Sequence, residues 1–308
     1  MKSKYINPFT DFGFKKIFGE EASKPLLIDF LTSLLPETNI VDLTFTDKEK
    51  LGNSKRDRGA VFDIYCVDNN GERIIVEMQK AKQNYFIERT VFYATFPIQE
   101  QAESGDWNYN LKSVFCVGIL DFKFDEKVKS GDGEVIHTVQ LKNQNNELFY
   151  KKLKFVYLEM PHFIKKEAEL VTRLDKWLYF IKHLEGFEKI PEIFKDEVFF
   201  KAFEKAEIAK YNDEERSDYE DSLKIFRDNK AVYDYAFVTV PKIAYDEGME
   251  KGMEKGMEKG MEKGIEIGIE KTKIEEKYHF AKVLKQNGEP VEKIMKYTGL
   301  TLDVIDKL

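Results

Sequence analysis

Hydrophobic residues recur along the chain with helical spacing in some segments and with strand-like runs in others. Apolar residues three or four positions apart predict a helix over residues 10–35, which ends before Pro36. Runs of β-branched and aromatic residues follow, then a second helical pattern kinked near Pro97 and a fully apolar strand. The strands are expected at 40–45, 60–67, 73–78 and 113–120, and the second helix at 86–103. The predicted order is helix, three strands, helix, strand.

The sequence pattern of the rest of the chain changes twice, first to an aromatic-rich helical region and then to a short repeat. Residues 134–141 and 154–160 predict two more strands, and from residue 163 to about residue 230 the pattern is helical and rich in aromatic side chains. A four-residue repeat follows, mostly Gly-Met-Glu-Lys, with glycines at positions 248, 252, 256, 260, 264 and 268. Short helical segments are expected after it at 271–286, 290–298 and 301–308.

The repeat is a poor isolated helix. Its glycines cost on the order of 5–6 kcal/mol relative to alanine, and like charges face each other four residues apart. Because the period exceeds 3.6 residues, the Met positions drift around the axis by about 40° per unit. We therefore expect either a simple spacer or a semi-flexible segment that becomes helical when it forms a homo-oligomer.

The composition indicates a globular chain. Of its 308 residues 42% are hydrophobic, and 25 Phe and 15 Tyr can fill a large core. No apolar run reaches the roughly 18 residues of a membrane span, and the first residues lack the apolar stretch of a secretory signal. We expect a cytoplasmic protein without a membrane partner. Two distant cysteines and four scattered histidines argue against a disulfide scaffold or a zinc site.

The net charge of −7 argues against an extensive DNA-binding surface, because Lys and Arg supply most of the affinity for phosphates. The excess is unevenly distributed. Residues 1–120 carry 15 basic and 17 acidic side chains, whereas the remainder carries 34 and 39. The N-terminal part is therefore nearly neutral, and DNA remains a candidate substrate that would be bound weakly and in a salt-sensitive way.

The polar segment 68–72 between two strands predicts a hairpin turn. If the turn is centred on Asn70, Asp63 lies directly opposite Glu77. Two carboxylates so close repel each other unless a cation neutralises them, and with water and a phosphate they suit Mg²⁺ or Mn²⁺. A two-residue turn at Asn70-Gly71 would shift the register, and carboxylates on a half-exposed strand often serve solubility. Both interpretations are open on this evidence.

Strand alternation places the other residues of the hairpin. Gln79 shares the Glu77 face, which we expect to be a polar cleft. Lys80 lies on the opposite face, and neither it nor Lys82 is assigned a role. That opposite face is expected to be an apolar layer formed by Phe62, Ile64, Ile74, Val76 and Met78.

These motifs, in this order, resemble a known family. Asp63 in VFDIY and Glu77 with Gln79 in IIVEMQ are similar to the signature of the PD-(D/E)XK nuclease superfamily. The chain resembles more closely the transposase-like branch of that superfamily, the Rpn family of recombination-promoting nucleases. The resemblance covers nearly the whole chain. Its other matching pieces are residues 7–18, the series Arg89, Tyr93 and Gln101, the segment LDKW at 174–177, and the repeat tail.

The resemblance implies an α/β fold with a restriction-endonuclease-like core, in which helices flank a central mixed sheet. A helical region and a repeat-containing helical tail would follow this core. The expected divisions are a PD-(D/E)XK nuclease-like core at 1–160, a helical extension packed on it at 161–245, the repeat spacer at 246–270 and a small helical C-terminal segment at 271–308.

The resemblance also implies an activity, that of a metal-dependent DNA endonuclease. Asp63 and Glu77 would hold the metal and act in catalysis together with Gln79, which stands where the wider superfamily usually has lysine. The implied cofactor is Mg²⁺, with Mn²⁺ or Ca²⁺ as alternatives, and the implied partner is DNA. Cleavage would promote recombination or transposition-like events, or restrict mobile DNA.

The amide at position 79 keeps a second function open. It hydrogen-bonds, but unlike an ammonium group it carries no charge with which to stabilise a transition state. The alternative is therefore a weakly active or inactive nuclease-fold protein that acts as a DNA-binding or oligomeric partner module.

Several further residues have both a functional and a structural interpretation. Asp11 is either a helix cap or a supporting acidic residue of the site, which the resemblance favours. Arg89 and Tyr93 share a helix face, where they either orient the scissile phosphate or only pack. Lys15 and a basic stretch before the Asp63 strand either contact DNA or are solvated. The DNA-contacting candidates are Lys15, Lys55, Arg56 and Arg58.

Overall fold

The computed structural model describes residues 3–46, 49–50, 60–80, 85–124 and 133–308, and residues 49–50 by their backbone alone. It divides into two compact units, Met1–Tyr233 and Asp234–Leu308. The first unit contains the whole segment predicted as the nuclease-like core and most of the predicted helical extension. No described helix is both long and apolar enough to cross a membrane.

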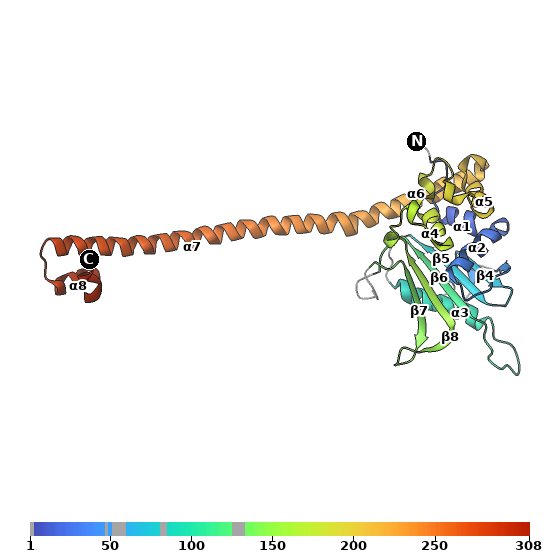
Figure 1. Ribbon diagram of the computed structural model, residues 1–308, viewed down its shortest axis with the longest axis horizontal. Helices are drawn as coiled ribbons and strands as arrows, with labels where there is room; N and C mark the ends of the chain where they lie inside the picture. Colours follow the sequence, from blue (N-terminus) through green and yellow to red (C-terminus); the bar gives the residue numbers. More distant parts are fainter. Residues whose placement is uncertain (1–2, 47–48, 51–59, 81–84, 125–132) are drawn as a thin grey trace. The chain divides into compact units, whose positions relative to one another are not determined.

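The first unit is built on a mixed six-stranded sheet with the strand order β1-β4-β5-β6-β8-β7 (Figure 1). Strands β1, β4 and β5 pair antiparallel, β5, β6 and β8 pair parallel, and β7 returns antiparallel to β8. The α/β fold predicted from the sequence is thereby confirmed. The strands are β1 Leu43–Phe45, β4 Ile64–Asp68, β5 Arg73–Gln79, β6 Val114–Leu120, β7 Ile136–Lys142 and β8 Leu148–Glu159. Two short strands, β2 Glu49–Lys50 and β3 Ala60–Val61, form a separate pair.

Both faces of this sheet are covered by helices. One face joins the buried residues of α1 Asp11–Phe18, α2 Lys24–Leu34, α4 Arg173–His183 and α5 Glu197–Ala206 in a large aromatic core. The other face packs on α3 Phe86–Gln99 in a smaller core (Figure 1). Every residue of β6 is buried, as its continuous apolar run predicts.

The helix predicted over residues 10–35 is wrong as a single element. The structure has α1, a 3₁₀ turn at Glu21–Ser23, and α2. The chain leaves α1 at Gly19, and Pro25 stands in the first turn of α2. Proline has no N–H to donate and is favoured only at a helix start, so the apolar pattern spans two helices that share one face.

The LDKW segment anchors the aromatic core. Thr172 caps α4 by accepting from the Asp175 backbone N–H at 3.0 Å. Trp177 is fully buried, and its indole N–H donates to Asp29 of α2 at 2.6 Å. Arg173 donates to the same carboxylate at 2.7 Å. This matching segment therefore has a structural role, because it ties α4 to α2.

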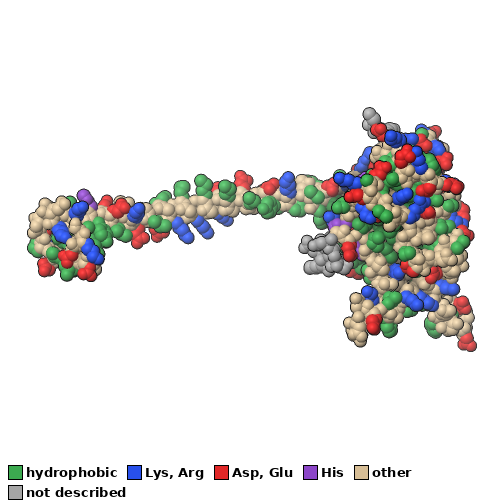
Figure 2. Space-filling model, in the orientation of Figure 1, with side chains coloured by type: hydrophobic (Ala, Val, Ile, Leu, Met, Phe, Trp, Pro, Cys, Tyr) green, Lys and Arg blue, Asp and Glu red, His purple; other side chains and the backbone are tan. Residues whose placement is uncertain are grey.

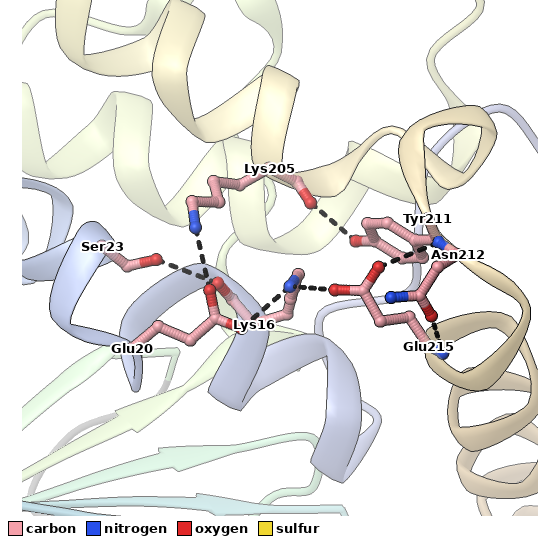
Figure 3. A network of polar contacts seen from close by, with 7 residues as sticks. All are labelled: Lys16, Glu20, Ser23, Lys205, Tyr211, Asn212 and Glu215. Carbon is pink, nitrogen blue, oxygen red and sulfur yellow. Dashed lines mark hydrogen bonds and ion pairs between the residues drawn. The ribbon is translucent and has the colours of Figure 1, made fainter.

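Helix α6, Asp213–Asp234, is fastened to α1 by polar contacts (Figure 3). Lys16 of α1 binds Glu20 at 2.9 Å and Glu215 of α6 at 2.6 Å. Lys205 of α5 binds Glu20 at 2.8 Å. Because these pairs are half-buried and shared, they fix the three helices relative to one another more firmly than isolated surface pairs would.

The second unit contains a helix through the whole repeat, so the predicted repeat-containing helical tail is confirmed. After a π-helical turn at Tyr235–Thr239, α7 runs from Val240 to Gln286 without a break. It continues α6 along the chain, so it does not bear a separate nucleation cost, which offsets part of the glycine penalty. Hydrophobic, basic and acidic side chains alternate on its surface (Figure 2). Its last turns pack on α8 Val291–Thr298 and α9 Leu302–Asp306 through Ala281, Ile294 and Ile305.

Two helical glycines give opposite predictions. A Cβ at Gly13 would lie 2.2 Å from the Asn7 carbonyl oxygen, so Gly13→Ala must displace backbone and should lower the free energy of unfolding by about 2 kcal/mol or more. Gly252 has open space around it, so Gly252→Ala should stabilise α7 by about 1 kcal/mol. Thermal unfolding followed by tryptophan fluorescence tests the first unit, and far-UV circular dichroism tests α7. Equal melting temperatures for Gly13→Ala and the wild type would contradict the close packing of α1.

Candidate metal and nuclease site

The hairpin between β4 and β5 has the register that places the two predicted metal ligands opposite each other. Ile64 pairs with Val76 and Tyr65 with Ile75, and one further step in this register sets Asp63 opposite Glu77. The turn is closed by a hydrogen bond of 3.0 Å, which the Asp68 N–H donates to the Glu72 carbonyl oxygen. The alternative two-residue turn is therefore excluded.

Asp63 lies in an interruption between β3 and β4 and is held by the neighbouring strand. Its carboxylate accepts the Met78 backbone N–H at 2.7 Å, and its own N–H donates to Glu77 Oε1 at 3.2 Å. Strand N–H groups lie in the plane of the sheet, so the Asp63 carboxylate lies in that plane where β4 begins, beside Glu77 of the inner strand β5. The interruption also corrects the placement of Phe62, which packs on Tyr65 and Tyr93 on the α3 side and not in the opposite layer.

Burial makes this carboxylate pair electrostatically unfavourable without a cation. Only 9% of Glu77 is exposed. Burial, followed by the charge of Asp63, raises the pKa of Glu77 to about 8. Burial also raises the pKa of Asp63, and the nearby Asp11 adds to the effect. A divalent cation would remove the repulsion, so the donor set fits a hard metal ion such as Mg²⁺.

The protein offers few other ligands at this place. Among the residues that the structure describes, no group of three or more His, Cys, Asp or Glu side chains is arranged to hold a metal ion. Asp63 and Glu77 would therefore leave most coordination positions to water and to substrate oxygens. Mg²⁺ commonly binds in this way, because it retains several of its waters.

Gln79, Arg89 and Tyr93 meet on the α3 side of the sheet. The Arg89 guanidinium donates to the Gln79 side-chain oxygen and lies 5.8 Å from the centre of the Tyr93 ring. Tyr93 and Glu77 line the same small hollow. The structure thus brings these three residues together with Glu77. The face predicted as a polar cleft is nevertheless largely apolar, because α3 covers it with aromatic side chains.

Helix α1 approaches the pair from the other side. Thr10 caps the helix by accepting from the Gly13 N–H at 3.0 Å, so the interpretation of Asp11 as the cap is wrong. Asp11 instead lies in the first turn and pairs with Lys15 at 2.9 Å. Both side chains act on the pKa of Asp63, which Asp11 raises and Lys15 lowers. The remaining DNA-contacting candidates, Lys55, Arg56 and Arg58, lie outside the described residues.

A cavity of about 500 Å³ separates α1 from α6 beside the end of β5. Its lining includes Asp11, Lys15 and Lys80, whereas Asp63 and Glu77 lie outside it. Sequence analysis placed Lys80 on the strand face opposite Gln79 but assigned it no role, because the family signature drew attention to position 79. It also missed the α6 wall, since the contacts that bring α6 here join residues far apart in the chain. The α6 residues of the lining are Asp218, Asp221, Ser222 and Ile225.

Comparison with known proteins identifies the family. Residues 8–236 match the family model described as PD-(D/E)XK nuclease family transposase. Comparisons with curated proteins and with solved structures find no match. The matched segment contains both carboxylates, the whole sheet and all of α6.

The raised pKa of Glu77 predicts how the stability of the metal-free protein depends on pH. Its pKa is about 8 in the folded protein, above its ordinary value of 4.5. The stability that it contributes is therefore fully present below pH 4.5 and is lost as pH rises towards 8. In EDTA, Glu77→Gln should melt near the wild type at pH 5 and roughly 10 °C above it at pH 8.5.

Glu88→Gln on the exposed side of α3 serves as the control for Glu77→Gln. It should show the same difference from the wild type at both values of pH, as measured by differential scanning fluorimetry. If the difference between Glu77→Gln and the wild type does not depend on pH, Glu77 is not a buried, destabilising carboxylate.

Proposed function

Because the chain belongs to the PD-(D/E)XK nuclease family transposases, we propose that it is a Mg²⁺-dependent DNA endonuclease. The reaction would be hydrolysis of a phosphodiester bond, in the cytoplasm, in a way that promotes recombination or transposition-like events or restricts mobile DNA. One observation carries this proposal, the close approach of the half-buried Asp63 carboxylate to the buried Glu77 carboxylate where β4 begins.

Each residue of the site has a part in this proposal. Asp63 and Glu77 hold the metal, and the Met78 N–H keeps the Asp63 side chain in place. When bound, the ion supplies positive charge and lowers the pKa of a water molecule. Gln79, oriented by Arg89, hydrogen-bonds to the attacking water, while Arg89 and Tyr93 support it from α3. Asp11 and Lys15 tune the charge around Asp63.

The mixed charge of the first unit supports weak and salt-sensitive DNA binding. On the face visible in Figure 2, basic and acidic side chains are interspersed. Affinity that depends on a few phosphate contacts and on the metal should be weak, and it should fall with ionic strength by about one power of the salt concentration for each contact.

A second candidate function rests on Gln79. Its oxygen accepts from Arg89 and its amide carries no charge, which favours slow chemistry. In that case the chain would act as a DNA-binding or oligomeric partner module. The exposed methionines of α7, 62–77% accessible at Met249, Met253, Met257 and Met261, are the surface through which we propose that a homo-oligomer forms.

Nicking of supercoiled plasmid separates the two functions. We expect the wild type to nick or cut in Mg²⁺ and not in EDTA. Asp63→Asn keeps the side-chain shape but removes a metal ligand, so its rate should fall at least about 100-fold. The measurement is the fraction of relaxed and linear plasmid over time on an agarose gel.

Glu88→Gln, which removes an exposed carboxylate from α3, should nick at the wild-type rate. Melting temperatures within a few degrees of the wild type establish that the variants are folded. Nicking that survives Asp63→Asn would refute the site. A gel shift of DNA without any cleavage by the wild type would favour the partner module.

A further inference from the structure

The cavity between α1 and α6 has a charge pattern that does not suit a DNA track, so a phosphate group could be bound there only by an individual lysine. Acidic side chains outnumber basic ones in its lining, so a polyanion is not attracted along its length. The basic residues are Lys15, Lys16 and Lys80, and the acidic ones are Asp11, Glu20, Asp218 and Asp221.

The three lysines differ in whether their charge is already engaged. Lys15 pairs with Asp11 at 2.9 Å, and Lys16 bridges two glutamates at 2.9 and 2.6 Å. Lys80 makes no hydrogen bond or ion pair with the part of the chain that the structure describes. It is therefore the lysine of this cavity whose ammonium is available to an incoming anion.

The position of Lys80 carries an energetic cost. The side chain is half-buried at the end of β5, and burial lowers its pKa, while the carboxylates of Asp11 and Asp63 raise it. A half-buried ammonium without a hydrogen-bond partner is unfavourable. An anionic group that enters beside Asp63 would supply the missing partner.

The amide at position 79 is turned away from this cavity. In β5 the side chains of Val76 and Met78 join the core that contains α1, and Glu77 meets α3. Gln79 follows the same alternation and binds Arg89 of α3. The α1 side of the carboxylate pair therefore receives its cation from position 80 and not from position 79.

We propose that Lys80 donates a hydrogen bond to a non-bridging oxygen of the scissile phosphate from the α1 side, and so supplies the positive charge that Gln79 lacks. This inference rests on the proposed nuclease function. A lysine at this place stabilises the negative charge that builds up on the phosphoryl oxygens during hydrolysis. Lys80 would thus touch the substrate and be a catalytic residue, while Asp218 and Asp221 restrict the cavity to a single phosphate.

Replacement of the ammonium tests the proposal. Lys80→Met keeps the aliphatic stem, so kcat for plasmid or oligonucleotide cleavage in Mg²⁺ should fall about 100-fold while KM changes little. Lys201→Met is the matched control, because Lys201 is 54% exposed on α5 and pairs only with a glutamate one turn away. It should cleave at the wild-type rate.

Chemical rescue distinguishes the amine from a structural effect. Alkylation of Lys80→Cys with 2-bromoethylamine rebuilds an ammonium of nearly the same length. Both native cysteines, Cys66 and Cys116, are buried, so the new thiol is the accessible one, which mass spectrometry of the folded protein verifies. The alkylated Lys80→Cys protein should recover at least a tenth of wild-type kcat, whereas the unmodified variant stays as slow as Lys80→Met.

The outcomes separate this inference from the function on which it rests. If the wild type does not cleave in Mg²⁺, both fail. If the wild type cleaves and Lys80→Met cleaves equally fast, the nuclease stands and the role of Lys80 is refuted. Loss of activity that fully alkylated Lys80→Cys protein does not recover would also refute it, because the defect would then lie in packing.

Discussion

The Asp63 carboxylate accepts a backbone N–H that a regular hairpin would give to a carbonyl oxygen. In the register of β4 and β5, Met78 would bond to the Phe62 carbonyl, but the chain bends at residues 62–63 and the Asp63 side chain takes that place. This substitution lets two carboxylates lie side by side where the inner strands β4 and β5 meet. The cost of that arrangement without a cation is the physical reason to expect a metal there.

Much of the fold follows from local patterns. The polar turn reduced the hairpin register to two alternatives, of which the structure has the one centred on Asn70, and β6 could be predicted because a run buried on both faces has no alternation. The bend at Phe62 could not, since VFDIY has a continuous strand pattern and only the Asp63 hydrogen bond breaks it. The helical tail was predicted from the family resemblance, whereas propensity alone underestimates α7, because it ignores that a helix which continues an earlier helical segment is already nucleated.

The candidate site likewise has a part that local sequence patterns predict and a part that they do not. Asp63, Glu77, Gln79 and Arg89 come from neighbouring segments whose geometry is nearly fixed by strand and helix periods, and the structure brings them together. The α6 wall depends on contacts such as the Asn7 N–H with the Tyr219 hydroxyl, 212 residues apart in sequence. No sequence period or motif predicts such a contact. The cavity that Lys80 lines could therefore not be predicted from the sequence.

The glutamine at position 79 is consistent with its surroundings once both faces of the sheet are considered. A lysine there would place an ammonium against the Arg89 guanidinium, and two cations at that distance repel each other in a poorly solvated layer. An amide oxygen instead accepts from Arg89 and keeps that cation near Glu77, whose pKa it lowers. Positive charge is thus retained on the α3 side by Arg89, while the adjacent lysine lies on the α1 side. If Lys80 acts as proposed, the departure from the superfamily signature moves a positive charge across the strand and does not remove it from the site.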